Sequence, residues 1–423
     1  PPPMGSPVQP VLAMDLPGID PSLFALVGEE AAAMGIARVA LVGGGVRDGL
    51  LHLLDGVPWR GCRDLDFLVE GDAVALAEAL FLRVGPERIT RLQIHRSYGT
   101  AELELDGLLV DFASARLESY PSPGANPVVT SGDLESDLER RDFSVNAMAI
   151  VLGVSSLEEG LVDPHAGLQD LEARELSFLH RTSVADDPTR VVRAARYATR
   201  LGFKLGPDGR EQVARCVKAW PWPWSQGDPV ASAPPALSTR LRMELELLFD
   251  EKPWPHALQC LEDWDAFPLL DSGLQTDPRR ELRLRRAARL GLPLTAALLL
   301  GADAPLEVAE RLQLPSQQIR WLGQAQEVLS WLGSDEIRAS LPAWTPADWT
   351  EALERRGWSA EGVALALVES EQHWRPLLRW WGRWRHLTSP KSANTLIAEG
   401  WTPGPELGAE LKRCRRQRLE NSR

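Results

Sequence analysis

A short stretch of this 423-residue chain combines a glycine-rich turn with two closely spaced carboxylates. An apolar run at residues 39–42 is typical of a strand, which we predict at 38–42. It leads into Gly43, Gly44 and Gly45, and a leucine-rich helical pattern follows at 46–54. Glycines at a strand-to-helix turn let the backbone approach a polyanion closely, and the helix start offers unpaired N–H groups at its positive end. The pattern predicts a phosphate-binding turn, although tight turns also use glycine for steric reasons alone.

The paired carboxylates are Asp64 and Asp66, which lie in a second strand-like run at residues 64–69. Because successive side chains of a strand alternate between its two faces, both carboxylates point from the same face. Their like charges repel each other and favour protonation, a penalty that a divalent cation removes. Mg²⁺ commonly binds such carboxylates together with substrate phosphates, whereas a solvated charged edge strand is the alternative for the pair alone. Turn and pair together predict phosphoryl chemistry on a nucleotide.

A third carboxylate, Asp111, follows a predicted hairpin turn at Gly107, between strand-like runs at 97–105 and 108–113. The hairpin brings Asp111 back beside the earlier strands. Asp111 lies among apolar residues, where an unpaired carboxylate is costly. It is therefore a candidate third carboxylate of the metal site, with a structural salt bridge as the alternative.

The composition, 44% hydrophobic and 25% charged residues, is that of a soluble globular protein, and the length suggests roughly two to four domains. No apolar stretch approaches the roughly 20 residues of a membrane span, so no membrane partner is expected. The net charge of −13 argues against non-specific nucleic-acid binding over the whole surface. The four cysteines are scattered, which suggests neither a disulfide framework nor a zinc site and fits a cytoplasmic location.

Short strands and helices alternate between residues 36 and 152, which predicts a small α/β domain with a mixed sheet. Residues 1–35 are predicted to form a disordered or irregular lead. Residues 116–139 contain three prolines and two glycines, which predicts a long loop of the kind that is often functional. Beyond about residue 205 the pattern is helical, and the Pro/Trp-rich segment 219–235 is typical of an insertion or linker.

Two polar clusters lie between these segments. The first, Arg140–Asn146, offers the groups that phosphate and ribose contacts need. The second opens a predicted helix on which Asp187, Arg190 and Tyr197 fall on one stripe. The acceptors of Asp187 and the rigid donor fork of Arg190 could read a base edge, with a common intrahelical ion pair as the alternative.

In this order, these pieces resemble the bacterial class II tRNA nucleotidyltransferase (CCA-adding enzyme) and poly(A) polymerase family, in the polymerase-β-like nucleotidyltransferase superfamily. The matching segments are GGGVRD with DLDF, VDFASARLESY, ERRDFSVNAMA, LVDPHAGLQDL, DDPTRVVRAARYATRLGF, STRLRMEL and EGWTPGPELGAEL. The resemblance is dense from about residue 38 to 248 and sparse afterwards until the tail.

The resemblance implies an α+β fold, in which a small mixed-sheet nucleotidyltransferase head domain precedes an all-helical neck, body and tail. The segments it implies are the head at 36–152, the neck at 153–250 with the nucleotide-selecting motif, the body at 251–330 and a tRNA-binding tail at 331–423.

The resemblance also implies roles for individual residues. Asp64 and Asp66 would bind two Mg²⁺ ions, and Asp111 would complete the catalytic carboxylates. The implied nucleotide-binding residues are Gly44, Gly45, Arg47, Arg140, Asp142, Asn146, Asp187, Arg190 and Arg193. The implied supporting residues are Arg116, Glu118, Asp186, Arg240 and Glu244. Asp186 stands where the family usually carries Glu, and its shorter side chain leaves open how firmly the arginine fork is held.

The implied activity is template-independent addition of CCA, from CTP and ATP, to the 3′ end of tRNA by two-metal in-line transfer to the 3′-OH, with release of pyrophosphate. The loop around Arg116, Glu118 and Gly124 resembles the flexible loop associated with adding the terminal A, which CC-only enzymes lack. Full CCA addition, A addition beside a separate CC-adding enzyme, and poly(A) synthesis therefore stay open. A non-catalytic RNA-binding relative is a further alternative, which the clustered aspartates disfavour. The expected partner is the acceptor arm and 3′ end of tRNA, and the sequence indicates no oligomeric state.

Overall fold

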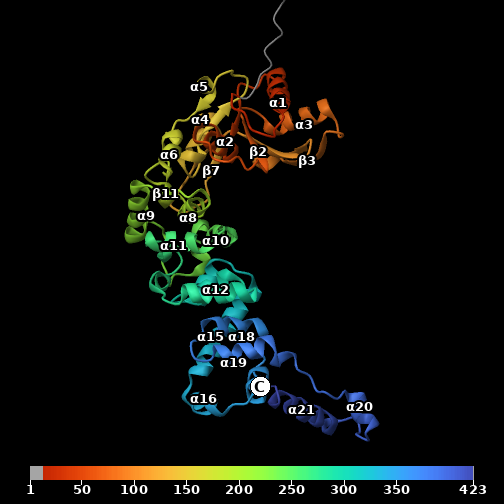
Figure 1. Cartoon of the computed structure of the whole chain (residues 1–423). Helices are drawn as coiled ribbons and strands as arrows, with labels where there is room; N and C mark the ends of the chain where they lie inside the picture. Colours follow the sequence, from red (N-terminus) through yellow and green to blue (C-terminus); the bar gives the residue numbers. More distant parts are fainter. Residues whose placement is uncertain (1–12, 423) are drawn as a thin grey trace, which may run out of the picture. The chain divides into compact units, whose positions relative to one another are not determined.

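The computed structural model describes residues 13–422, which fall into two compact units. The first unit comprises the chain up to Pro223 with Pro234–Ala236 and Glu251–Trp264, and the second comprises Trp224–Ala233, Leu237–Asp250 and the chain from Asp265 onward. The strands lie in the first unit, mostly in the red to yellow part of Figure 1, and the second unit is built of helices. In the described part of the chain, no helix combines the length and the apolar character that crossing a membrane requires.

A seven-stranded sheet is the main strand structure of the first unit. In spatial order its strands are β3 (Ile89–His95), β4 (Thr100–Leu105), β5 (Leu108–Ser114), β2 (Asp64–Val69), β1 (Val39–Val42), β8 (Ala149–Val151) and β9 (Leu161–Val162). β2 and β5 run parallel and the other neighbouring pairs run antiparallel, so the expected mixed sheet is confirmed. The predicted hairpin turn at Gly107 joins β4 to β5, with Gly107 at a φ of +84°.

Helices cover this sheet and continue the first unit beyond it. Their bounds are α1 (Pro21–Ala33), α2 (Gly44–Asp55), α3 (Ala73–Val84), α4 (Leu134–Glu139), α5 (Leu157–Gly160), α6 (Gly167–Ala173), α7 (Ser183–Asp186), α8 (Thr189–Leu201), α9 (Pro207–Ala219) and α11 (Trp254–Asp263). Two-stranded sheets are formed by β6 (Arg116–Ser119) with β7 (Val128–Ser131) and by β10 (Glu175–Leu176) with β11 (Lys204–Leu205). α3 packs on β3, β4 and β5, and α2 packs on β1 and β2.

The large sheet has an apolar face and a face that carries carboxylates. Along β2, Phe67 alternates with Asp64 and Asp66, so aromatic and acidic side chains point to opposite sides. The ring of Phe67 stacks on Phe112 of β5, with centroids 5.3 Å apart, and meets Phe24 of α1 at 6.1 Å. Burial of these rings stabilises the pairing of β2 with β5 and thereby sets where the acidic side chains lie.

The predicted irregular lead at 1–35 is wrong for the residues that form α1. Asp20 caps this helix, Pro21 suits its first position, and its apolar side chains are buried against the sheet and α3. Residues 1–12 lie outside the described residues. Tertiary burial thus makes a helix of a segment whose prolines and glycines suggested an irregular lead.

The predicted loop at 116–139 contains β6, β7 and α4. α4 forms because Leu134 and Leu138 are buried in a cluster with small side chains of the sheet, such as Ala149. The connection between β6 and β7 is the part of this segment that remains a loop. The predicted strand at 97–105 begins only at Thr100, and β3, which precedes it, was not expected because most of its side chains are not fully buried.

The boundaries of the predicted segments also shift. β9 extends the large sheet past the head boundary at residue 152, since it pairs with β8. α11 packs against α8 in the first unit, although residue 251 was predicted to open the body. Glu251 pairs with Arg196 and Arg200 of α8, which helps to hold this helix there. Both the packing of α11 on α8 and this charge pairing join segments that are distant in the sequence, which no local pattern reveals.

The second unit consists of helices, and α18 lies in its core. Their bounds are α10 (Thr239–Asp250), α12 (Arg280–Leu290), α13 (Leu294–Leu299), α14 (Pro305–Arg311), α15 (Ser316–Gly333), α16 (Asp335–Ser340), α17 (Pro346–Arg355), α18 (Ala360–Glu369), α19 (Trp374–Gly382), α20 (Ala393–Ala398) and α21 (Pro405–Glu420). α18 contacts α12, α15 and α19, and its residues from Gly362 to Val368 are buried. A helix that is apolar on all sides belongs in a core, and α18 has that place.

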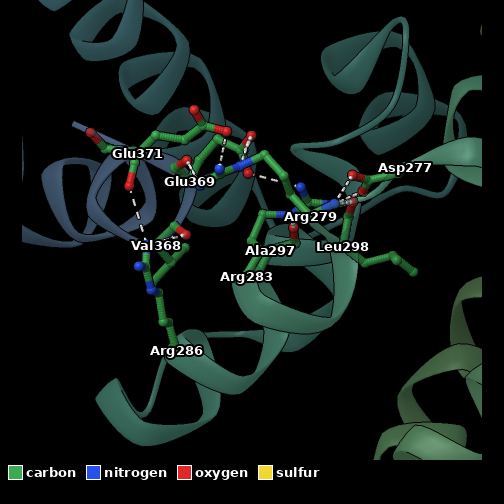
Figure 2. Close-up of polar contacts among 10 residues, drawn as sticks. Asp277, Arg279, Arg283, Arg286, Ala297, Leu298, Val368, Glu369 and Glu371 are labelled. Carbon is green, nitrogen blue, oxygen red and sulfur yellow. Dashed lines mark hydrogen bonds and ion pairs between the residues drawn. The ribbon is translucent and has the colours of Figure 1, made fainter. Parts of the chain in front are cut away.

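A buried arginine connects three parts of this unit. Arg283 of α12 is fully buried, and Figure 2 shows its guanidinium among acidic side chains and backbone carbonyl groups. Its Nε donates to the carbonyl of Ala297 at 2.6 Å, and its Nη1 donates to Oε2 of Glu369 at 2.8 Å. Its Nη2 pairs with Asp277 and donates to the carbonyl of Leu298. One side chain therefore joins α12 to α13 and α18.

Candidate active site

The three predicted carboxylates lie on one face of the large sheet. Asp66 of β2 and Asp111 of β5 are direct partners in the parallel register, and Asp64 is two residues before Asp66 on the same face. Burial and the neighbouring charge of Asp64 raise the pKa of Asp66. Burial, with the charges of Asp66, Glu102 and Asp64, raises the pKa of Asp111 to about 6. The fold thus concentrates more negative charge here than it compensates.

The glycine-rich turn begins beside this acidic group. β1 ends at Val42, Gly43 has a φ of +74°, and α2 starts at Gly44, so the predicted strand–turn–helix is confirmed. A Cβ built on Gly43 would lie 2.9 Å from Oδ2 of Asp66 and 3.9 Å from Nη1 of Arg141. Only glycine allows both this backbone conformation and this approach. The N-terminal end of α2, where Gly44 and Gly45 lie, therefore sits next to the carboxylates.

The carboxylate set fits Mg²⁺. Among residues 13–422, no three His, Cys, Asp or Glu side chains come close enough to hold an ion by themselves. Mg²⁺, however, usually takes one or two carboxylates and completes its shell with water and substrate phosphates. The raised pKa values of Asp66 and Asp111 mark an excess of negative charge that a divalent cation would neutralise.

A chain of buried polar groups connects the turn to α8. Nη1 of Arg47, on α2, donates to Oδ1 of Asn146 at 2.7 Å, and Nδ2 of Asn146 donates to Oδ1 of Asp142 at 3.0 Å. Nε and Nη2 of Arg193, on α8, both donate to Oδ2 of Asp142. Burial disfavours the Asp142 carboxylate, but the Arg193 charge and the hydrogen bonds from Asn146 and Arg193 outweigh it, so the pKa of Asp142 lies below its usual value. These predicted residues form one connected group.

Tyr197 lies at the centre of three arginines. The guanidinium carbons of Arg47, Arg193 and Arg200 lie 5.5, 5.9 and 5.4 Å from the centroid of its ring. The face of an aromatic ring attracts cations, so Tyr197 helps to hold the two predicted nucleotide-binding arginines in place. Its position on the stripe of α8 was the sequence signal that could have placed it in the site.

A second group of polar side chains surrounds Asp137. Asp137 was not among the predicted site residues, so the group was not expected. This fully buried side chain accepts hydrogen bonds from Nε of Arg140 at 2.9 Å and from Nη2 of Arg141 at 3.3 Å, and its Oδ1 accepts from the backbone N–H of Arg116. Oε1 of Glu118 completes the group, 3.0 Å from Nη2 of Arg116 and 3.4 Å from Nη1 of Arg140. The i, i+3 and i, i+4 spacing of Asp137 to the two arginines was the available signal.

The predicted nucleotide-selecting residues lie at the junction of α7 and α8. Nη2 of Arg190, whose side chain is buried, donates to the carbonyl of Arg140 at 2.9 Å. Asp187 accepts from the backbone N–H and the hydroxyl of Thr189, at 3.1 and 2.6 Å. Oδ2 of Asp186 accepts from the hydroxyl of Thr182 at 2.7 Å. Backbone carbonyl groups and caps thus orient this segment.

The expected helical stripe is wrong at its first residue. Asp187 has an extended backbone, with φ −145° and ψ 90°, because it precedes Pro188 and the ring of proline disfavours helical dihedrals in the residue before it. Arg240 and Glu244 lie on α10, which belongs to the second unit, so their support of α8 stays a prediction.

The part of the chain that carries this site is similar to known proteins. Residues 39–177 match the family model of the poly A polymerase head domain. This range contains the three aspartates and those members of both polar groups that precede α8. An A-adding tRNA nucleotidyltransferase of Aquifex aeolicus is 43% identical over 182 residues, which are 43% of this chain and 20% of the relative. A CC-adding tRNA nucleotidyltransferase of Deinococcus radiodurans is 39% identical over 234 residues, 55% of each chain. The chain therefore spans about a fifth of the first relative and about half of the second.

Solved structures resemble the chain over a greater length. The apo form II of a CCA-adding enzyme is 25% identical with a TM-score of 0.73, and the match covers 95% of this chain and 93% of that one. Complexes of a CCA-adding enzyme with ATP and with CTP have TM-scores of 0.67 and 0.68 at 26% and 25% identity, and cover 95% of this chain and 92% of theirs.

Proposed function

We propose that this chain is a class II tRNA nucleotidyltransferase, which its head-domain sequence and its fold support, and that it adds CCA to the 3′ end of tRNA without a nucleic-acid template. The observation that carries the proposal is the placement of Asp64, Asp66 and Asp111 on one sheet face beside the Gly43 turn. CCA-adding enzymes that bind ATP and CTP share its fold, which supports these two nucleotides as substrates. The relatives named as tRNA nucleotidyltransferases support tRNA as the acceptor. The proposed location is the cytoplasm.

Asp64 and Asp66 would hold two Mg²⁺ ions together with phosphate oxygens of the nucleotide. When bound, the ions would supply Lewis-acid stabilisation of the attacking oxygen and of the departing pyrophosphate. In the transfer, the 3′-hydroxyl oxygen of the RNA forms a bond to the α-phosphorus, the bond from that phosphorus to the pyrophosphate oxygen breaks, and the hydroxyl proton is released.

The chain's own residues bind and orient the nucleotide in this proposal. The backbone N–H groups at the start of α2 and the guanidinium of Arg47 receive the triphosphate, because a helix N-terminus favours anions. Asp142 and Asn146, already held by Arg47 and Arg193, present hydrogen-bonding groups to the ribose. Asp187 and Arg190 select the base by donors and acceptors, and the buried position of Arg190 strengthens that discrimination.

Replacing Arg190 by Ala should reduce the preference for CTP and ATP over UTP and GTP more than it reduces the metal-dependent rate. Losing the hydrogen bonds of a charged donor in a buried site costs about 1.5–3 kcal/mol, which corresponds to roughly 10- to 100-fold in discrimination. The measurement is single-nucleotide incorporation with each of the four nucleotides, expressed as kcat/KM ratios. Arg190→Lys keeps the charge without the planar fork, so its selectivity should also fall.

The matched control is Arg210→Ala. Arg210 is an exposed residue of α9, in the same unit. This control should keep the nucleotide ratios of the unmodified chain. Equal ratios for Arg190→Ala, Arg210→Ala and the unmodified chain would contradict the base-selecting role.

The experiment that tests the proposed function is primer extension with Mg²⁺ on three RNAs: tRNA without CCA, tRNA ending in CC, and an unstructured oligonucleotide. Each RNA receives CTP, ATP or both. We expect full CCA on the first RNA and growth that stops there. Addition restricted to the CC-ended tRNA would instead identify an A-adding enzyme, which needs a separate CC-adding enzyme.

A-adding activity is the second candidate, because an A-adding relative is 43% identical over 182 residues and the loop between β6 and β7 is present. An extension that stops at CC would contradict the interpretation of that loop. Long A tails on the oligonucleotide would identify a poly(A) polymerase. No extension of any RNA would leave a non-catalytic RNA-binding relative.

A further inference from the structure

The Pro/Trp-rich segment 219–235 contributes a buried side chain to the first unit. Trp222 is 3% exposed, and its indole N–H donates to the backbone carbonyl of Ala185 at 2.9 Å. The ring of Trp220 meets it edge to face, with centroids 4.8 Å apart. A buried Trp usually finds a partner for its N–H, and here that partner is a carbonyl at the end of α7.

The same indole ring also lies against the tip of the loop between β6 and β7. Gly124, at the tip, has a φ of +75°, and a Cβ built on it would lie 2.9 Å from Cδ1 of Trp222 and 3.1 Å from Cβ of Pro234. The backbone N–H of Gly124 donates to the carbonyl of Asp186 at 3.1 Å, and its carbonyl accepts from the N–H of Ala236 at 3.2 Å. The loop tip is therefore held on several sides.

These contacts converge on two successive carbonyl groups, those of Ala185 and Asp186. The last carbonyl groups of a helix have no partner within it, and here Trp222 takes one and Gly124 takes the other. Asp187 follows at once, and α8 begins two residues later. The direction in which the chain leaves α7, and hence the position of the base-selecting residues, depends on how these carbonyl groups are held.

We propose that Trp222 is a positioning residue for nucleotide selection, acting through the carbonyl of Ala185 and the loop tip at Gly124. The inference rests on the proposed function and assigns the 219–235 segment a part in it. Trp222 does not touch the nucleotide. It holds the loop tip and the end of α7 as one body, so that Asp187 and Arg190 meet the base in one geometry. A displacement of about 1 Å in such a group can cost about 100-fold in rate.

The test is Trp222→Phe, which keeps an aromatic ring at this position and removes the five-membered ring, with both its N–H and the atoms that lie against Gly124. We expect the ratio of kcat/KM for ATP to that for GTP, on tRNA ending in CC, to fall about tenfold, since a buried carbonyl loses its donor. The corresponding CTP to UTP ratio on tRNA lacking CCA is measured in parallel. Gly124→Ala, which presses on Trp222 from the other side, should change the ratios in the same direction.

The matched control is Trp224→Phe. Trp224 belongs to the same segment and its indole N–H also donates to a backbone carbonyl, that of Pro229 at 3.2 Å, but this contact lies in the second unit. Its ratios should equal those of the unmodified chain. A loss of folded protein lowers kcat/KM for all nucleotides alike and cancels in each ratio, so the readout separates positioning from stability.

Unchanged ratios in Trp222→Phe, with normal selection by the unmodified chain, would overturn the inference and leave the proposed function standing. An equal change in Trp224→Phe would also overturn it, because the effect would then not depend on the Ala185 contact. If the unmodified chain extends none of the tRNAs, the proposed function fails and this inference fails with it.

Discussion

Replacing Asp66 by Asn should abolish nucleotidyl transfer while leaving tRNA affinity nearly unchanged. The substitution keeps the shape of the side chain and removes the charge that would hold Mg²⁺ beside Asp111 and the Gly43 turn. Metal stabilisation is worth several kcal/mol in such reactions, so we expect the rate to fall about 10³-fold or more. The same result is expected for Asp64→Ala. The measurement is single-turnover extension of tRNA together with a filter-binding titration.

The matched control is Asp106→Asn, in the turn that precedes β5. Asp106 is exposed, lies in the β4–β5 hairpin turn with a φ of +51° that Asn also tolerates, and pairs with Arg88. The Asp106→Asn variant should transfer nucleotides at the rate of the unmodified chain.

Without metal, the Asp66→Asn variant should be at least as stable to unfolding as the unmodified chain, because the substitution relieves charge repulsion among Asp64, Asp66 and Asp111. Transfer by Asp66→Asn at the unmodified rate would refute the carboxylate assignment.

Replacing Arg283 by Leu should destabilise the second unit by about 3–5 kcal/mol, because removing one partner of a buried ion pair leaves the charge of the other partner uncompensated. The side chain of Arg283 is 1% exposed and that of Asp277 is 7% exposed, so Asp277 loses a charge partner in a buried position, whereas Glu369 keeps Arg279 (Figure 2). The carbonyl groups of Ala297 and Leu298 also lose a donor. The measurement is urea unfolding followed by tryptophan fluorescence, because several tryptophans, such as Trp331, lie in this unit.

The control for this prediction is Arg285→Leu on the same helix. Its side chain is 61% exposed and pairs with Glu281 one turn away, a contact worth about 0.3–0.5 kcal/mol. The unfolding midpoint should barely move in the control and should fall clearly in Arg283→Leu. Similar shifts in both variants would show that the buried network contributes little to stability.

The parts of the candidate site that could be predicted from the sequence are those whose cause is local. Glycines after an apolar run predict the turn at Gly43, and the two-residue period of a strand places Asp64 and Asp66 on one face. The hairpin at Gly107 follows from the positive φ that glycine adopts readily. In each case the residues that decide the conformation lie within a few positions of one another.

Other features of the site depend on residues that are distant in the sequence. Asp137 accepts hydrogen bonds from several arginines only because β6 and α4 pack together, which buries the Asp137 side chain among them. Trp222 reaches Ala185 across 37 positions, and the sequence marked its segment merely as an insertion. Pro188 restricts the backbone dihedrals of Asp187, which is a local effect. Asp187 was nevertheless expected on the helix, because its spacing to Arg190 fits the helical stripe.

By itself, then, the sequence determined which chemical groups this protein carries: a glycine-rich turn, a pair of aspartates and an arginine at a helix start. Only the tertiary structure decided which of these groups meet. The parallel pairing of β2 with β5 brings Asp111 beside Asp66, and the stacking of Phe67 on Phe112 stabilises it. The physical reason is that the spacing of side chains along a strand or helix follows from backbone geometry. Pairing between distant segments follows instead from the burial of side chains, and no local pattern shows which segments bury one another.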